Sequence, residues 1–94
     1  MLIVELLQAM TTWWLSFCDA NKPDGKQFIG ACIVSGTDFI NAVENSHAKG
    51  CNPGGEVAGR EMPAHLVMMV PTKMRDTLLN IEQIGKIQKL LAPS

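Results

Sequence analysis

His47 and Cys51 stand four residues apart, a spacing that could bring an imidazole and a thiol to one face of a helix. Such a pair could form a thiolate nucleophile or, with one more cysteine, part of a zinc site. Gly50 lies between them, however, and we expect it to end the helix in a left-handed conformation, which breaks that geometry. The sequence therefore favours a partly buried helix residue at His47 and assigns no metal ligand.

Aspartates that could do acid–base chemistry stand near the ends of predicted strands, at Asp19, Asp24 and Asp38. General acid–base catalysis would need two of these carboxylates to converge, and turn or capping roles account for each of them. The chain has two histidines and no tyrosine, so it offers no clustered acid–base set. We therefore expect no enzyme activity, no catalytic residue and no cofactor.

The run NPGGE at residues 52–56 is the most distinctive segment of the chain. Proline followed by glycine fits a type II turn, in which glycine supplies the positive φ angle. The same glycines would also let a ligand approach the backbone, whose successive N–H groups could hold an anion. Arg60, four residues further on, could reach a phosphate or carboxylate, or could be a solvated strand residue. The candidate binding residues here are Asn52, Gly54, Gly55, Glu56 and Arg60.

The adjacent tryptophans Trp13 and Trp14 lie in an aromatic stretch that favours a strand. Neighbouring strand residues point to opposite faces of a sheet, so one indole can join the core and the other cannot. We expect Trp13 on the core face with Leu15 and Phe17, which makes Trp14 a candidate binding residue. An exposed tryptophan can anchor a protein interface or stack on a base. The alternative is that the C-terminal helices or residues 1–9 cover it.

Length and composition fit one small domain over residues 1–94. The hydrophobic share of 47% is typical of a globular chain, and the formal net charge of −1 disfavours binding to nucleic acid. A core this small would gain from an oligomer or a bound partner, so we expect a homo-oligomer, most simply a dimer. The three cysteines have no disulfide pattern, which favours a cytoplasmic protein, and no stretch is long enough to cross a membrane.

Residues 1–9 allow two interpretations. The composition changes sharply at Met10, so the functional chain could begin there and residues 1–9 could be an N-terminal extension. Alternatively, Leu2, Leu6 and Ala9 have helical spacing and could dock on the fold or on a second subunit.

The elements that position these residues follow from periodicity and turn residues. We expect a strand over 12–18, a long loop, and a central strand over 28–34 that is apolar on both faces. A helix should begin with Thr37 as its N-cap and end at Gly50. Its sheet-facing residues should be Phe39, Ala42, Val43 and Ser46.

The second half of the chain should add one strand and two helices. We expect a third strand over 56–62, which Pro63 ends, and then a helix over 73–79 with Thr72 as its cap. Asn80 and Gln83 resemble a second capping signal, so a break near Asn80 should precede a last helix. That helix carries an apolar stripe at Ile81, Ile84, Ile87, Gln88 and Leu91. The predicted fold is α+β, a small antiparallel sheet of about three strands in the order β-β-α-β-α-α, covered on one face by helices.

Four stretches of the chain resemble a family of small uncharacterised proteins from bacteriophages and their bacterial hosts. They are WWLSF at 13–17, FIGA at 28–31, Asp38-Phe39, and GCNPGGEV at 50–57. The resemblance covers roughly residues 10–80 and supports Met10 as the family-like start. It implies a phage or prophage setting, and because the family carries no settled activity it supplies no site residues. Small phage proteins of this size often bind and disable a component of a host defence system or its nucleotide signal, an argument by analogy.

These observations lead to two functional hypotheses. The first is a non-enzymatic phage-type binding protein that occupies a host or phage protein, as an inhibitor of a host defence system, supported by the paired tryptophans and a methionine-rich segment. The alternative is a protein that sequesters an anionic small ligand such as a nucleotide signal. In that case the turn at 52–56 and Arg60 would hold the anion, and Trp14 would stack on the base. Neither hypothesis involves nucleic acid or a membrane.

Overall fold

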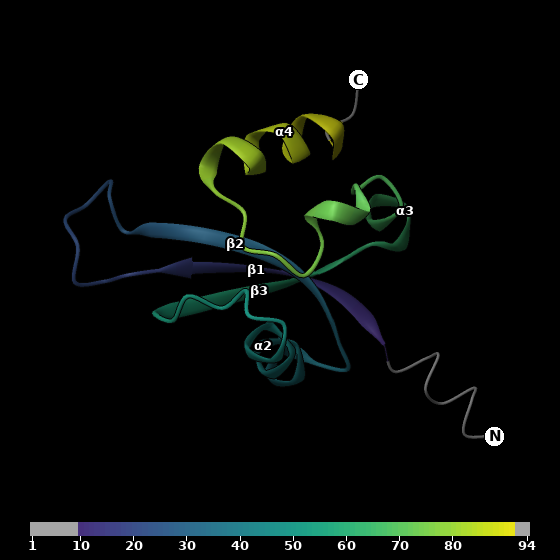
Figure 1. Cartoon of the computed structure of the whole chain (residues 1–94), viewed down its shortest axis with the longest axis horizontal. Coiled ribbons are helices and arrows are strands. Elements are labelled where there is room, and N and C mark those ends of the chain that lie inside the picture. The colour runs from purple at the N-terminus through teal and green to yellow at the C-terminus, as the bar shows by residue number, and fades with distance from the viewer. Residues whose placement is uncertain (1–9, 92–94) are drawn as a thin grey trace.

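The computed structural model describes residues 10–91, and both interpretations of residues 1–9 lie outside that range. Three strands form one antiparallel sheet in the order β2-β1-β3 (Figure 1). The element order confirms the predicted α+β fold. The elements are β1 (Thr11–Cys18), β2 (Phe28–Gly36), α2 (Phe39–Ala48), β3 (Glu56–Met62), α3 (Ala64–Val67), the short 3-10 helix η1 (Thr72–Met74) and α4 (Ile81–Leu91).

The central strand is β1, and the prediction that residues 28–34 are central was wrong. Strand β2 is apolar on both faces because helices cover both of them, although it lies at an edge of the sheet. Its outer edge is also partly closed by the backbone of Leu79. The Leu79 N–H donates to the Ala31 carbonyl at 2.7 Å, and the Ala31 N–H donates back at 3.1 Å. Burial alone therefore did not distinguish a central strand from a covered edge strand.

Helices cover both faces of the sheet, whereas the sequence led us to expect one covered face (Figure 1). Trp13, Leu15 and Phe17 of β1 pack on the side of α2 and are at most 9% exposed, which confirms the predicted core face. On the opposite face, Ala31 and Ile33 of β2 form a second cluster with α4. The second core exists because β2 presents apolar side chains in both directions, and each face needs a cover.

Helix α2 begins one residue later than expected. Asp38, and not Thr37, is the N-cap, and its carboxylate accepts a hydrogen bond from the Asn41 N–H at 2.7 Å. Both residue types serve as caps, so composition alone could not choose between neighbours. Gly50 follows the helix with a φ of +74°, as predicted.

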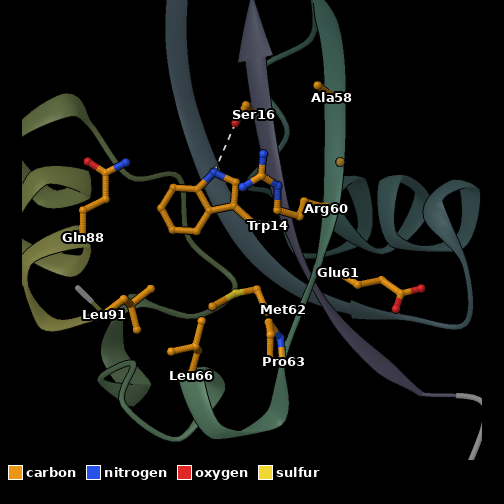
Figure 2. Close-up of a pocket in the computed structure, with 11 residues that line it drawn as sticks. Trp14, Ser16, Ala58, Arg60, Glu61, Met62, Pro63, Leu66, Gln88 and Leu91 are labelled. Atoms are coloured by element: carbon orange, nitrogen blue, oxygen red, sulfur yellow. Dashed lines mark hydrogen bonds between the residues drawn. The ribbon is translucent and has the colours of Figure 1, made fainter. Parts of the chain in front are cut away.

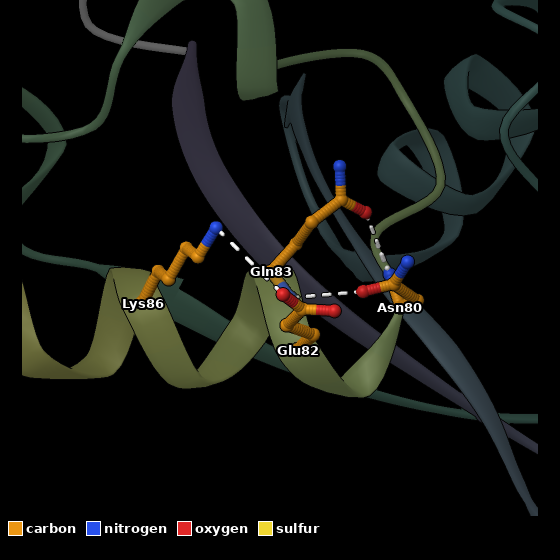
Figure 3. Close-up of polar contacts among 4 residues, drawn as sticks. All are labelled: Asn80, Glu82, Gln83 and Lys86. Atoms are coloured by element: carbon orange, nitrogen blue, oxygen red, sulfur yellow. Dashed lines mark hydrogen bonds and ion pairs between the residues drawn. The ribbon is translucent and has the colours of Figure 1, made fainter.

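The segment before α4 differs most from its predicted structure. The predicted helix over 73–79 is absent: η1 covers Thr72–Met74, and the chain then runs alongside β2. Pairing with the open edge of β2 outweighs the helical propensity of residues 73–79. The predicted capping signal is confirmed, since Asn80 Oδ1 accepts from the Gln83 N–H at 2.9 Å and Gln83 Oε1 accepts from the Asn80 N–H at 3.0 Å (Figure 3).

Removal of this cap should measurably destabilise the protein. Asn80→Ala is expected to lower the free energy of unfolding by about 1 kcal/mol, because it leaves the backbone N–H of Gln83 unsatisfied. Glu82→Ala is the matched control in the same helical turn. It breaks an exposed 3.9 Å ion pair with Lys86 and should cost less than about 0.5 kcal/mol. Urea unfolding followed by circular dichroism measures both, and equal effects would contradict the capping role.

Candidate functional site

A groove of about 440 Å³ runs between the sheet and the C-terminal helices (Figure 2). Strands β1 and β3 form its floor, α4 forms one wall, and α3 closes one end. It exists because α4 packs over β2, while the same face of β3 carries no helix within residues 10–91. The principal lining side chains are Trp14, Ser16, Arg60, Met62, Leu66 and Leu91.

The alternation of β1 places the two tryptophans on opposite faces of the sheet. Trp13 joins the core on the α2 face, where its indole N–H donates to the Gly36 carbonyl at 3.2 Å. Trp14 is half-buried on the other face, where it packs against the core formed with α4 and lines the groove. The alternative that the C-terminal helices cover this indole is therefore partly confirmed. The Trp14 indole N–H donates to the Ser16 hydroxyl at 3.1 Å, which orients the ring within the groove (Figure 2). The structure therefore resolves which indole is available to a partner.

Arg60 lies directly across from Trp14 in the β1–β3 register, so both side chains point to the groove face (Figure 2). The arginine is exposed, and within residues 10–91 no carboxylate forms an ion pair with it. Glu61 follows it in the strand, and its side chain points away from the groove. Arg60 is therefore the cation that the groove offers to a ligand.

The four candidates in the turn at 52–56 are not part of this groove. Glu56 lies across from Cys18 at the other end of β3, about 13 Å along the strand from Arg60. Asn52 Oδ1 accepts from the Gly54 N–H at 2.8 Å, and its amide donates to the Ser46 hydroxyl at 2.9 Å. The Gly54 amide is thus already bonded and is not free for an anion.

Gly55 has a structural reason to be glycine. Its φ is +81°, and a Cβ atom at this position would collide with the Cys18 carbonyl oxygen. Gly54 has a similar φ of +87°, but a Cβ there would meet no atom within 4 Å. The structure therefore separates the sequence candidates into Trp14 and Arg60 in the groove, and Asn52, Gly54, Gly55 and Glu56 in a turn that connects α2 to β3.

Several groove residues were not candidates from sequence. Gln88 and Leu91 belong to the predicted stripe of α4, and their periodicity indicated a buried face but not a groove wall. Met62 and Leu66 stand at the junction of β3 and α3, where the sequence has no clear periodicity. Only the packing of α4 against β2 brings these segments to one place.

The cysteines and histidines do not form a reactive centre within the described residues. Cys51 is 2% exposed, its thiol donates to the Ser46 carbonyl, and burial raises its pKa above the ordinary value. Burial and the neighbouring Cys51 also raise the pKa of Cys32. High pKa values keep thiols protonated and poorly nucleophilic. His47 is exposed, so the expectation of a partly buried histidine was wrong. No three His, Cys, Asp or Glu side chains among residues 10–91 converge on a metal position.

The aspartates have the local roles that their positions indicated. Asp19 Oδ1 accepts from the Asn21 N–H at 3.0 Å, and Asp38 caps α2. Asp24 is exposed in the loop between β1 and β2.

Comparison of the chain with protein-family models, with curated proteins and with solved structures found no match. Over the part of the chain that the structure describes, no helix is long and apolar enough to cross a membrane.

Proposed function

We propose that this chain is a non-enzymatic binding protein that acts by occupying a protein partner through the groove between α4 and β3. The observation that carries the proposal is the pairing of Trp14 with Arg60 on the open floor of the groove. Tryptophan and arginine are the residue types most enriched among the side chains that dominate binding energy at protein interfaces. Their position opposite each other provides an aromatic surface beside a cation, which fits an apolar segment that carries an acidic residue.

The shape and charge of the groove favour a protein segment over a small anionic ligand. A nucleotide site needs several converging donors, but among residues 10–91 Arg60 is the one cationic side chain that lines this groove. Small-ligand pockets enclose most of their ligand, whereas this groove lies open along β3. The chain also exposes large apolar side chains close to α3, with Met68 at 85% and Met69 at 48%. Methionines are common on adaptable protein-binding surfaces.

The biological setting of the proposal comes from the sequence resemblance alone. A phage or prophage protein of this size that binds a host protein would act in the bacterial cytoplasm, as an inhibitor of a host defence system. That setting directs the search for a partner towards bacterial proteins.

A second candidate function, binding of a nucleotide, would use the same two residues, Trp14 and Arg60. Trp14 could stack on a base and Arg60 could hold a phosphate, so that the chain would sequester a nucleotide signal. The specific observation in its favour is that the structure brings these two predicted residues together. Against it, the turn at 52–56 lies outside the groove and supplies no further donors there.

Matched variants test the protein-binding proposal. The full chain, immobilised, is used to recover proteins from bacterial lysate, and each recovered protein is then purified and titrated by calorimetry. We expect Trp14→Ala and Arg60→Glu to weaken binding of the true partner about 30-fold or more, as for a central interface residue. Ile40→Ala is the control, because Ile40 is 70% exposed and lies on α2, across the sheet from the groove.

The outcomes separate the two functions. If the unmodified chain and the three variants bound the partner equally, the groove would not be the binding site. The same would follow if Ile40→Ala weakened binding as much as the two groove variants. A parallel titration with ATP and cyclic dinucleotides measures quenching of tryptophan fluorescence, and a ligand in the groove would contact Trp14 and not the buried Trp13. Quenching that disappears in Arg60→Glu would favour the nucleotide alternative over a protein partner.

A further inference from the structure

The outer edge of β3 is a regular strand edge with no partner strand among residues 10–91. Its seven residues pair with β1 in unbroken register, with no bulge and no proline inside the strand. Ala58, Gly59, Arg60 and Glu61 are all exposed. The exposed surface of Gly59 is backbone, because glycine has no side chain.

The opposite edge of the sheet, the outer side of β2, is covered by another segment of the chain. Besides the bonds between Leu79 and Ala31, the Asp76 N–H donates to the Ile33 carbonyl at 2.9 Å, so the segment before α4 covers the outer side of β2. Proteins blunt an open edge with a bulge, a proline, charged side chains or a covering segment. The chain covers β2 with another segment, whereas β3 carries only charged side chains, Glu56, Arg60 and Glu61. Such charges disfavour pairing with an unrelated strand but favour a strand of complementary charge, so β3 is the edge available for strand addition.

We propose that β3 pairs with β3 of a second copy of this chain, in antiparallel orientation about a twofold axis at Ala58, to form a continuous six-stranded sheet. An isologous contact of this kind uses the same strand on both subunits and closes after two copies. A second copy of the chain is the partner because the charges along β3 complement those of an antiparallel β3.

The register follows from symmetry and charge. Directly opposite residues must point to the same face of the sheet, so the twofold axis must pass through a residue of β3. An axis at Ala58 places Glu56 of each copy opposite Arg60 of the other, which creates two reciprocal ion pairs. An axis at Arg60 would place two arginines opposite each other, and an axis at Gly59 would place Glu56 opposite Met62. Charge complementarity therefore selects Ala58.

The dimer also changes the surroundings of the groove. Because the twofold axis is perpendicular to the sheet, the grooves of both copies open on the same face, with their floors continuous across the β3–β3 contact. The open side of each groove then borders the other subunit. The dimer does not depend on the proposed function, since it rests on the strand edge and its charges. In the dimer Arg60 pairs with Glu56 of the other copy, so Trp14→Ala, which leaves the charges of β3 unchanged, is the variant that tests the groove independently of the dimer.

Sedimentation equilibrium of the full chain and of charge-reversal variants tests the dimer and its register. The unmodified protein should be a dimer. Arg60→Glu and Glu56→Arg should each raise the dimer dissociation constant about tenfold or more, because both ion pairs become repulsive contacts. The double variant, with both changes, should recover the original constant. Glu61→Arg is the control on the same strand, since in this register Glu61 faces Gly55 and should leave the constant unchanged.

A cross-linking experiment tests the same register without relying on charge. In a Cys18→Ser background, Ala58→Cys should form an intermolecular disulfide under mild oxidation with diamide, because the two residues at the axis are directly opposite. Glu61→Cys should not cross-link, because its copies lie about 20 Å apart along the strands. A monomer throughout the concentration range, or a dimer insensitive to both single reversals, would overturn the proposal. Sedimentation and cross-linking measure the mass of the assembly and not partner binding. Absence of the dimer can therefore be distinguished from failure of the groove to bind a partner.

Discussion

Leu79→Ala is expected to lower the free energy of unfolding by about 3 kcal/mol, within the range for buried leucines. Leu79 is 0% exposed and belongs to the core between β2 and α4. Its backbone is also held to Ala31, so the surrounding structure has little freedom to collapse into the cavity. For a domain of this size the loss is a large fraction of total stability.

Leu78→Ala is the matched control for this prediction. Leu78 is 39% exposed and is the neighbour of Leu79 in the chain, so its replacement should cost less than about 1 kcal/mol. Urea unfolding of both variants measures the difference. If the two substitutions had equal effects, the extended conformation of this segment would be wrong, because only pairing along β2 directs one leucine inward and the other outward.

Gly55→Ala is expected to destabilise the protein by about 2–4 kcal/mol, from a left-handed backbone conformation and an added clash. The new Cβ would collide with the carbonyl oxygen of Cys18, a backbone atom held in β1, so it has little room to move. Thermal or urea unfolding measures the loss. The result also bears on the anion-binding role predicted for this turn, since a ligand role alone would not affect the stability of the free protein.

Gly54→Ala is the matched control for Gly55→Ala. Gly54 has a similar positive φ, but nothing lies within 4 Å of its Cβ position. The substitution should therefore cost only the backbone strain, about 1 kcal/mol. A Gly54 variant as unstable as the Gly55 variant would contradict the close approach of Gly55 to Cys18.

Much of the candidate site could be anticipated from strand alternation. A period of two requires Trp13 and Trp14 to face opposite ways, and the apolar positions Leu15 and Phe17 assign Trp13 to the core. The alternation therefore identified Trp14 correctly as the residue on the other face. The proximity of Arg60 to Trp14 could not be derived in this way, because strand register depends on which residues of two distant segments align.

The turn at 52–56 shows where a local pattern allows two interpretations. The positive φ angle of Gly54 was expected from the predicted type II turn, and Gly55 has a positive φ as well. Whether their amides face a ligand or other parts of the chain depends on what packs nearby. In the folded chain, the Gly54 N–H donates to Asn52 Oδ1, and the Cys18 carbonyl oxygen packs directly against Gly55.

Local sequence determined the features of this protein that depend on neighbouring residues: the strands of the sheet, the C-terminal end of α2, the start of α4 with the reciprocal cap of Asn80 and Gln83, and the alternation of β1. The tertiary structure decided which strand is central, that both faces of the sheet are covered, and that residues 75–79 leave the helical conformation to pair with β2. The physical reason is that local features depend on backbone geometry and hydrogen bonds within a few residues. The others depend on burial and pairing between distant segments, whose energies can exceed the local preference of residues 73–79 for a helix. The groove itself belongs to the second class, since it exists only where α4 covers β2 and leaves β3 uncovered.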